Sequence, residues 1–180
     1  MSKDQFPQNY IDVKPHLNWD EYFVLIAMIT SFKSKDPSTK VGCVIVNQNK
    51  HQVSAGYNGM VAGIDENELP WGKDKTVPLE HQKYGYVVHA EANAILHASK
   101  SLEGCTAYVT LFPCNECAKL IASKKIKEVV YLSDKHKHQE STAISKKIFD
   151  LAGINYRPVE VSEELVTQLS DHLQTLRDSV

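Results

Sequence analysis

The sequence predicts an α/β fold in which a mixed sheet lies between layers of helices. Two strand patterns at 41–46 and 52–55, separated by a polar turn, predict a β-hairpin. From residue 106 onward, strand patterns alternate with helical patterns, which favours strands joined by helices. The chain has 180 residues, 42% hydrophobic and 23% charged, and this composition suits one soluble domain with a substantial core.

The first predicted helix follows a polar, proline-containing stretch at 1–16 that we expect to be an irregular arm. Asn18 followed by Glu21 matches a capping box, which marks a helix start. An apolar stripe at helical spacing continues to Thr30, and Asp36-Pro37 ends the segment because the residue before a proline disfavours helical backbone.

The returning strand of the hairpin is broken by Gly56-Tyr57-Asn58-Gly59. The two glycines permit either a close backbone approach or a plain turn, and the local sequence favours neither. Residues 60–87 then form a long polar connection with several glycines and prolines. A connection of this length within one domain is usually functional, so we expect a lid or a regulatory loop.

The remaining elements follow in alternation. We expect helices at 89–98, 114–124 and 141–152 and strands at 106–111, 128–132 and 155–159, with Gly153 ending the last of these helices. Residues 161–180 predict a C-terminal amphipathic helix with one leucine face, made of Leu165, Leu169, Leu173 and Leu176. We expect that face to pack on the domain or on a neighbouring subunit.

Two short motifs carry the chemistry. His89 and Glu91 are two apart, so they can approach one point only at the start of a helix, because each residue turns a helix by about 100°. Cys114 and Cys117 are three apart and lie together on a first helical turn. Both helices leave the sheet on the same side, which places the motifs at the strand ends, where α/β sheets bind ligands.

Together the motifs form His-x-Glu followed by Pro-Cys-x-x-Cys, the signature of a zinc-dependent nucleobase deaminase. His89, Cys114 and Cys117 supply three ligands to one Zn²⁺, and the fourth position is left for water. Glu91 is then free to move protons. A structural zinc needs a fourth ligand; the candidates are Cys43, Cys105 and His97, none of which has paired spacing.

Composition limits the partners. The formal net charge is −2 and there is no long basic block, which argues against a dedicated nucleic-acid-binding protein. The longest apolar run is too short to span a bilayer, and no signal peptide is evident, so we expect no membrane association. Free thiols suit a reducing compartment, and we expect a cytoplasmic location.

Several further segments carry a family resemblance: 34–37, 41–42, 56–60, 69–71, 111–121, 126–129 and 133–135. The chain resembles the cytidine deaminase superfamily, and within it the branch that acts on deoxycytidylate (dCMP). Gly56-Tyr57-Asn58-Gly59 is the part of the resemblance that marks this branch. The match spans about residues 19–158, so we divide the chain into the arm (1–16), a zinc-dependent deaminase domain (17–160) and the C-terminal helix (161–180).

The resemblance implies a three-layer α/β/α sandwich around a mixed five-stranded sheet, a homo-hexamer, and hydrolysis of dCMP to dUMP and ammonia, which supplies dUMP for thymidylate synthesis. It also implies the zinc ligands and proton shuttle named above, and a contact between Asn58 and the substrate sugar. Backbone groups near Ala90 would hold the base. The segment Gly56, Tyr57, Asn58 and Gly59 would join an allosteric site, where dCTP activates and dTTP inhibits, with Mg²⁺ accompanying the triphosphate.

One departure from the family concerns the region after the fourth strand. The family commonly has a tyrosine near the substrate there, whereas this chain has Lys135-His136-Lys137-His138. We expect Lys35 and Lys135 to contact the phosphate. Two alternatives remain: a deaminase of another nucleoside, base or transfer-RNA nucleotide, and a non-enzymatic scaffold stabilised by zinc.

Overall fold

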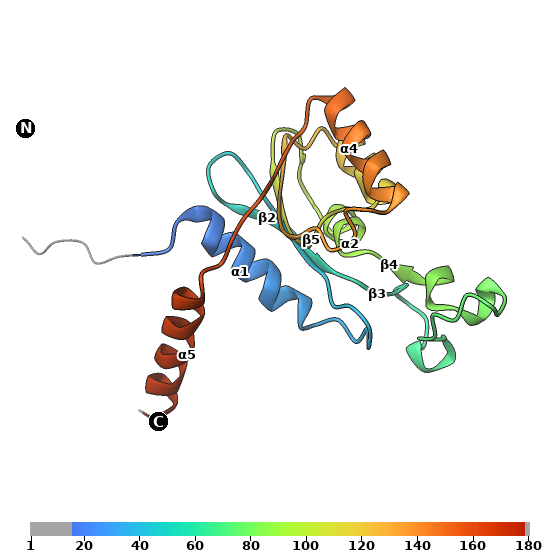
Figure 1. Ribbon diagram of the computed structural model, residues 1–180, viewed down its shortest axis with the longest axis horizontal. Helices are drawn as coiled ribbons and strands as arrows, with labels where there is room; N and C mark the ends of the chain where they lie inside the picture. Colours follow the sequence, from blue (N-terminus) through green and yellow to red (C-terminus); the bar gives the residue numbers. More distant parts are fainter. Residues whose placement is uncertain (1–15, 179–180) are drawn as a thin grey trace, which may run out of the picture.

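The computed structural model describes residues 16–178 and contains a five-stranded sheet in the order β2-β1-β5-β6-β7 (Figure 1). β1 (Gly42–Val46) runs antiparallel to β2 (Gln52–Tyr57) and to β5 (Thr106–Leu111). β5, β6 (Glu128–Ser133) and β7 (Asn155–Pro158) are parallel to one another. The predicted hairpin and the mixed sheet are therefore confirmed. The predicted arm lies outside the described residues, apart from His16.

The helix α1 (Trp19–Ser31) begins with the predicted capping box. The Asn18 side chain accepts from the backbone of Asp20 and Glu21, and the Glu21 carboxylate accepts from the Asn18 backbone at 2.8 Å. These contacts satisfy backbone donors that a helix start leaves unpaired. The helix ends at Ser31, earlier than Asp36-Pro37, and the residues between form turns.

Alternate side chains of each central strand face the two sides of the sheet, as the two-residue period of a strand requires. Cys43 and Ile45 pack with α2 (Ala90–Leu96), α3 (Asn115–Ser123) and α4 (Glu140–Ala152) on one side. Val44 and Val46 pack with α1 on the other side. The helices thus form the outer layers of a three-layer α/β/α sandwich, as expected.

Cysteine placement agrees with this arrangement, because Cys43 and Cys105 are buried in the larger core and carry free thiols.

The helix α4 ends at Gly153, as predicted. The φ of Gly153 is 67°, which is the left-handed conformation that glycine adopts most easily.

The long connection contains short structure of its own. β3 (Gly59–Met60) pairs with β4 (Val87–Val88), and three 3-10 helices lie between them: η2 (Glu66–Glu68), η3 (Leu79–His81) and η4 (Lys83–Gly85). In Figure 1 this segment projects away from the sandwich. Pairing of Gly59 with Val88 brings the end of the Gly56–Gly59 segment beside the residue that precedes His89.

The strand β2 continues through Gly56 and Tyr57, two residues beyond the predicted end. Gly56 allows a close approach of two backbones. A Cβ added there would lie 2.3 Å from the Ala94 nitrogen and 2.4 Å from the Ala90 oxygen. The strand therefore persists because only glycine lets it lie this close to α2.

The C-terminal helix α5 (Glu163–Asp178) extends away from the sandwich in Figure 1. Leu165 is buried and Leu169 half-buried, whereas Leu173 is 66% exposed; the side chain of Leu176 lies outside the described residues. Packing of the rest of this face stays a prediction. Within residues 16–178, no helix combines the length and the apolar character that crossing a membrane requires.

Candidate active site

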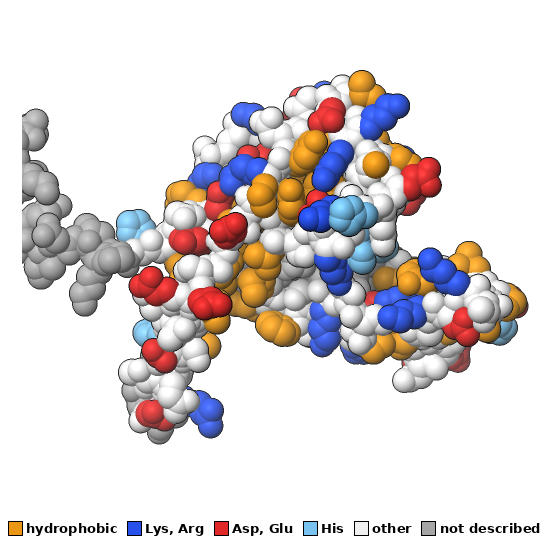
Figure 2. Space-filling view, viewed as in Figure 1, with side chains coloured by type: hydrophobic (Ala, Val, Ile, Leu, Met, Phe, Trp, Pro, Cys, Tyr) orange, Lys and Arg blue, Asp and Glu red, His pale blue; other side chains and the backbone are white. Residues whose placement is uncertain are grey.

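A cleft of about 470 Å³ opens at the ends of β1 and β5, in the size range of small-molecule sites. Its wall combines residues of α2, the long connection and the start of α4. Figure 2 shows lysine and histidine side chains gathered where the projecting segment meets the sandwich. The wall includes Asp36, Thr39, Asn58, Lys75, Lys83, His89, Ala90, Glu91, Leu111, Phe112, Cys114, His136 and Gln139.

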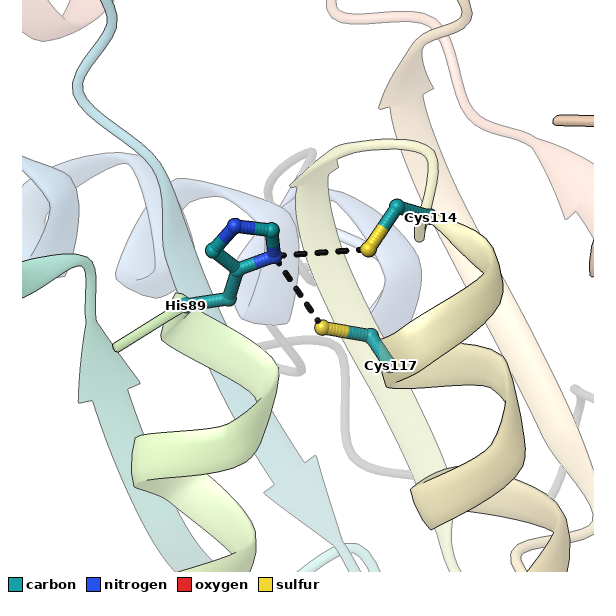
Figure 3. Close-up of side chains that lie close together, drawn as sticks. All are labelled: His89, Cys114 and Cys117. Atoms are coloured by element: carbon teal, nitrogen blue, oxygen red, sulfur yellow. Dashed lines mark hydrogen bonds between the residues drawn. The ribbon is translucent and has the colours of Figure 1, made fainter. Parts of the chain in front are cut away.

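The three predicted metal ligands converge on one point (Figure 3), and two of them, His89 and Cys114, line this cleft. His89 and Cys114 are the N-cap residues of α2 and α3, and Cys117 follows in the first turn of α3. His89 Nδ1 lies 3.4 Å from each of the two sulfur atoms. Tetrahedral zinc with ordinary Zn–N and Zn–S bonds requires a separation of about 3.5 Å between such ligand atoms.

The donor set also fits zinc in its charges. A hydrogen bond from Cys117 lowers the pKa of Cys114 to about 3, and His89 contributes further. The same hydrogen bond, together with burial, raises the pKa of Cys117. The two sulfurs alone therefore share a proton, which a divalent cation replaces when it binds. Among the described residues this group has three members and no fourth, which leaves one position of a tetrahedral zinc open.

Glu91 lies in the first turn of α2, and 4% of its surface is exposed. Burial raises the pKa of its carboxyl group above the usual 4.5, against the opposing effect of His89. The residue lines the cleft beside the three ligands. A carboxylate with a raised pKa next to an open metal position is suited to proton transfer.

Comparison with known proteins decides the family. The model of the cytidine and deoxycytidylate deaminase zinc-binding region matches residues 17–133. The chain belongs to this family. A deoxycytidylate deaminase of Mus musculus is 47% identical over 143 residues, which are 79% of this chain and 80% of that protein. A deoxycytidylate deaminase of Mycobacterium phage D29 is 39% identical over 63% of this chain and 94% of its own.

Solved structures of the family share the fold. The dCMP deaminase of cyanophage S-TIM5, in complex with dCMP and dUMP, superposes with a TM-score of 0.62 over 80% of this chain and all of that chain, at 23% identity. At this identity the likeness supports the fold alone. The deaminase fold predicted from the family resemblance is thereby confirmed.

Asn58 is buried at the junction of β2 and β3, on the cleft wall. Its Oδ1 accepts from the Val41 backbone at 2.8 Å, and its Nδ2 donates to the Asp36 carboxylate at 3.2 Å and to the Thr39 carbonyl at 3.0 Å. Both amide protons are therefore used inside the protein. One lone pair of Oδ1 remains, so Asn58 can accept one further hydrogen bond.

The two lysines predicted to contact phosphate lie outside the cleft wall. The Lys35 side chain is 72% exposed and pairs with Glu66 at 2.8 Å. Lys135 lies at the rim, where it donates to Thr39 Oγ1 at 3.3 Å. The wall itself presents Lys75, Lys83 and His136. Lys75 and Lys83 went unrecognised in the sequence because the long connection has no periodicity to indicate which lysines turn inward.

The other predicted site residues lie on α2 or on the strands that contact it and the residue before it. Ala90 is buried on the wall of the cleft. Gly56 and Tyr57 belong to β2, and Gly59 to β3. The Asn93 side chain donates to the Tyr57 carbonyl at 2.8 Å and so ties this segment to α2. Their predicted allosteric role stays a prediction.

Proposed function

We propose that this chain hydrolyses dCMP to dUMP and ammonia. The observation that carries the proposal is the position of Glu91, a buried carboxyl group beside three metal ligands, with no fourth ligand found within residues 16–178. A structural zinc site has no use for that combination. The relatives named deoxycytidylate deaminase, at 44–47% identity, support dCMP as the substrate.

The chain's own groups account for the proton transfers. When bound, zinc supplies a water molecule whose pKa is lowered toward neutrality. The Glu91 carboxylate takes a proton from the attacking water, which adds to C4 of cytosine, and delivers it to N3. It then carries the second proton to the amino group, which leaves as ammonia, and the ring retains the oxygen as uracil. Ala90 and Phe112 line the cleft around the base.

The sugar and phosphate belong at the other end of the cleft. We infer that Asn58 accepts a hydrogen bond from a sugar hydroxyl, since only an acceptor position remains on its amide. Lys75 and His136 also line the wall, and Lys135 donates to Thr39 at the rim. These side chains are the cationic groups available to the phosphate, and Lys35 would join them only by leaving Glu66.

The experiment is a comparison of substrates. Purified protein is incubated with dCMP, deoxycytidine, cytidine and guanine, and ammonia release is followed. We expect dCMP to be strongly favoured over deoxycytidine, because the phosphate adds contacts with cations. Equal turnover of the two would make the protein a nucleoside deaminase. Ammonia from guanine but not from dCMP would place it in another branch.

We further propose the regulation and assembly that the family resemblance suggests. dCTP, with Mg²⁺, would activate the enzyme and dTTP would inhibit it through the segment Gly56–Gly59, which borders Asn58 and contacts α2. The chain would assemble as a homo-hexamer and work in the cytoplasm, where a reducing environment preserves its thiols. Its product would feed thymidylate synthesis.

A further inference from the structure

Lys83 is a buried cation that the zinc chemistry leaves unexplained. It lies in η4, within the projecting connection, and 7% of its surface is exposed. Its backbone nitrogen donates to the Gly72 carbonyl at 2.7 Å, which ties it to the rest of the connection. Its ammonium group reaches the cleft wall and lies 2.6 Å from Asp36 Oδ2. Lysine is seldom buried unless it is paired, so the ion pair with Asp36 is what allows Lys83 to be buried at the cleft.

Asp36 divides its two oxygens between two tasks. Oδ1 accepts from the backbone of Ser38 at 2.7 Å and of Thr39 at 3.1 Å, which shapes the turn before β1. Oδ2 accepts from Lys83 and from the Asn58 side chain at 3.2 Å. One carboxylate oxygen therefore joins the long connection to the residue on the sugar side of the cleft.

The charge of Asp36 depends on these donors. Burial raises the pKa of its carboxyl group, but the hydrogen bonds from Lys83, Ser38 and Thr39 outweigh burial and hold the pKa below the usual 3.8. The carboxylate is therefore ionised and can only accept hydrogen bonds. It fixes the amide of Asn58 with the nitrogen toward Asp36 and the oxygen toward the Val41 backbone.

We propose that Lys83 is a positioning residue that holds Asn58, through Asp36, in the orientation that binds the substrate sugar. The proposal rests on the proposed function for the identity of the substrate. Residues 61–86 would therefore contribute to substrate binding, because the sugar subsite is complete only when Lys83 of this segment contacts Asp36. Displacing Lys83 would leave the buried Asp36 carboxylate without its counter-ion and loosen its hold on Asn58, which would then rely on Val41 and Thr39.

The test is a double-mutant cycle that joins Lys83→Met with Asn58→Ala, measured with dCMP and with deoxycytidine. Lys83→Arg keeps the charge and serves as the conservative variant. Lys73→Met removes an exposed lysine of the same connection and serves as the matched control. Zinc content and melting temperature establish that each variant is folded. Where K83M does not fold, D36N takes its place, since it presents an amide nitrogen to Asn58 but keeps the acceptor for Ser38 and Thr39.

We expect K83M to raise KM for dCMP about 10-fold, as loss of one charge-supported hydrogen bond would, while kcat stays close to wild type. The sugar contact is remote from the reacting carbon, so its loss weakens binding more than chemistry. KM for deoxycytidine should rise by the same factor, K83R should restore much of the loss, and K83M should cost nothing further in the N58A background.

Three results would overturn the proposal: an unchanged KM in K83M, additive effects in the cycle, or a loss confined to dCMP. The last would make Lys83 a phosphate ligand. If the wild-type protein does not act on dCMP, the proposed function fails, and the docking of the long connection by the Lys83–Asp36 ion pair is tested by proteolysis instead. Leu79 and Tyr84 flank Lys83 and are 60% and 51% exposed. Chymotrypsin should cleave after these residues faster in K83M than in K73M. Equal rates would show that Lys83 does not hold the connection in place.

Discussion

Glu91 and Asn58 derive their chemistry from the partners that the fold gives them. Glu91 is buried at the start of a helix, beside a metal ligand, and burial raises its pKa so that it can both accept and return a proton. Both amide protons of Asn58 are donated to groups of the protein, so its side chain can only accept a hydrogen bond from a substrate. At the residue scale, what each side chain can offer a substrate therefore depends on which of its donors and acceptors are already hydrogen-bonded within the protein.

Replacing Glu91 by glutamine tests the proton shuttle. The amide fills the same space but cannot take a proton, so turnover of dCMP should fall by roughly 10² to 10⁴-fold. Zinc content and melting temperature should stay near wild type, since Glu91 is not a ligand. Steady-state kinetics and elemental analysis make the comparison. The control is E116Q, at an exposed carboxylate beside Cys117, and near-full activity in E91Q would show that another group carries the proton.

At the scale of elements, the seam between β2 and α2 positions the metal site. Gly56 lets the strand pass against the first turns of the helix whose N-cap is His89. The Asn93 side chain closes the same seam on the Tyr57 carbonyl. Any displacement of α2 would move His89 relative to the two cysteines of α3.

Substituting alanine at Gly56 should open this seam. The new Cβ would meet backbone atoms at 2.3 and 2.4 Å, which cannot yield as a side chain can. Such overpacking costs about 1–3 kcal/mol in the free energy of unfolding, and zinc affinity should fall with it. The matched variant is G59A, whose Cβ meets only the Tyr57 ring at 3.6 Å. Denaturant unfolding and zinc titration compare the two variants. Equal stability of G56A and G59A would contradict the role given to Gly56.

A second set of contacts joins α1 to the sheet and predicts a pH dependence. Asp20 accepts from Arg157 at 2.7 Å and from the Tyr108 hydroxyl at 2.9 Å. The hydrogen bond from Arg157 holds the pKa of Asp20 below the usual 3.8. The folded state thus binds the proton less readily than the unfolded state. The contribution of the Asp20 charge to the free energy of unfolding is complete above the unfolded pKa of 3.8 and is lost as pH falls through the lower pKa of the folded state.

The D20N variant should therefore melt below wild type at pH 7, and the gap should narrow below pH 3.8. Thermal unfolding between pH 2 and pH 7 measures the gap. The variant D171N, at an exposed carboxylate of α5, should follow wild type throughout. A gap that stays constant with pH would show that the Asp20 charge contributes nothing.

The elements also show how far the sequence reaches. The metal ligands and Glu91 were predictable because they lie in two short motifs, His89–Glu91 and Cys114–Cys117, whose spacing and order match a known zinc signature. Gly56 left two readings open because the close approach involves α2, 34 residues or more along the chain. Lys83 gave no signal, since its partner Asp36 lies 47 residues away and an irregular connection decides which of its lysines turns inward.

For the whole molecule, several large apolar side chains remain exposed. Leu173 of α5 is 66% exposed. Ile29 of α1 and Phe32, the residue that follows α1, are 68% and 73% exposed. Large exposed apolar side chains are typical of surfaces that contact another subunit. Burial of these faces in a homo-oligomer stays a prediction.

The proposed effector control would involve the whole molecule. Saturation curves with dCMP are measured with dCTP, with dTTP and with neither, each in the presence of Mg²⁺. We expect dCTP to raise and dTTP to lower the apparent affinity for dCMP, by about 5- to 150-fold, the usual range of allosteric coupling. Three superimposed curves, with no change in melting temperature on adding dCTP, would show that the chain lacks the effector site.

We propose that hydrolysis of dCMP depends on one zinc per chain, held by His89, Cys114 and Cys117 beside Glu91. The most direct measurement is a titration in which zinc is removed by a chelator and returned stepwise, while dUMP formation is followed. We expect no dUMP before zinc is added, then a linear rise in activity with a sharp break at one zinc per chain. Full activity without zinc, or a break at two zinc ions per chain, would contradict it.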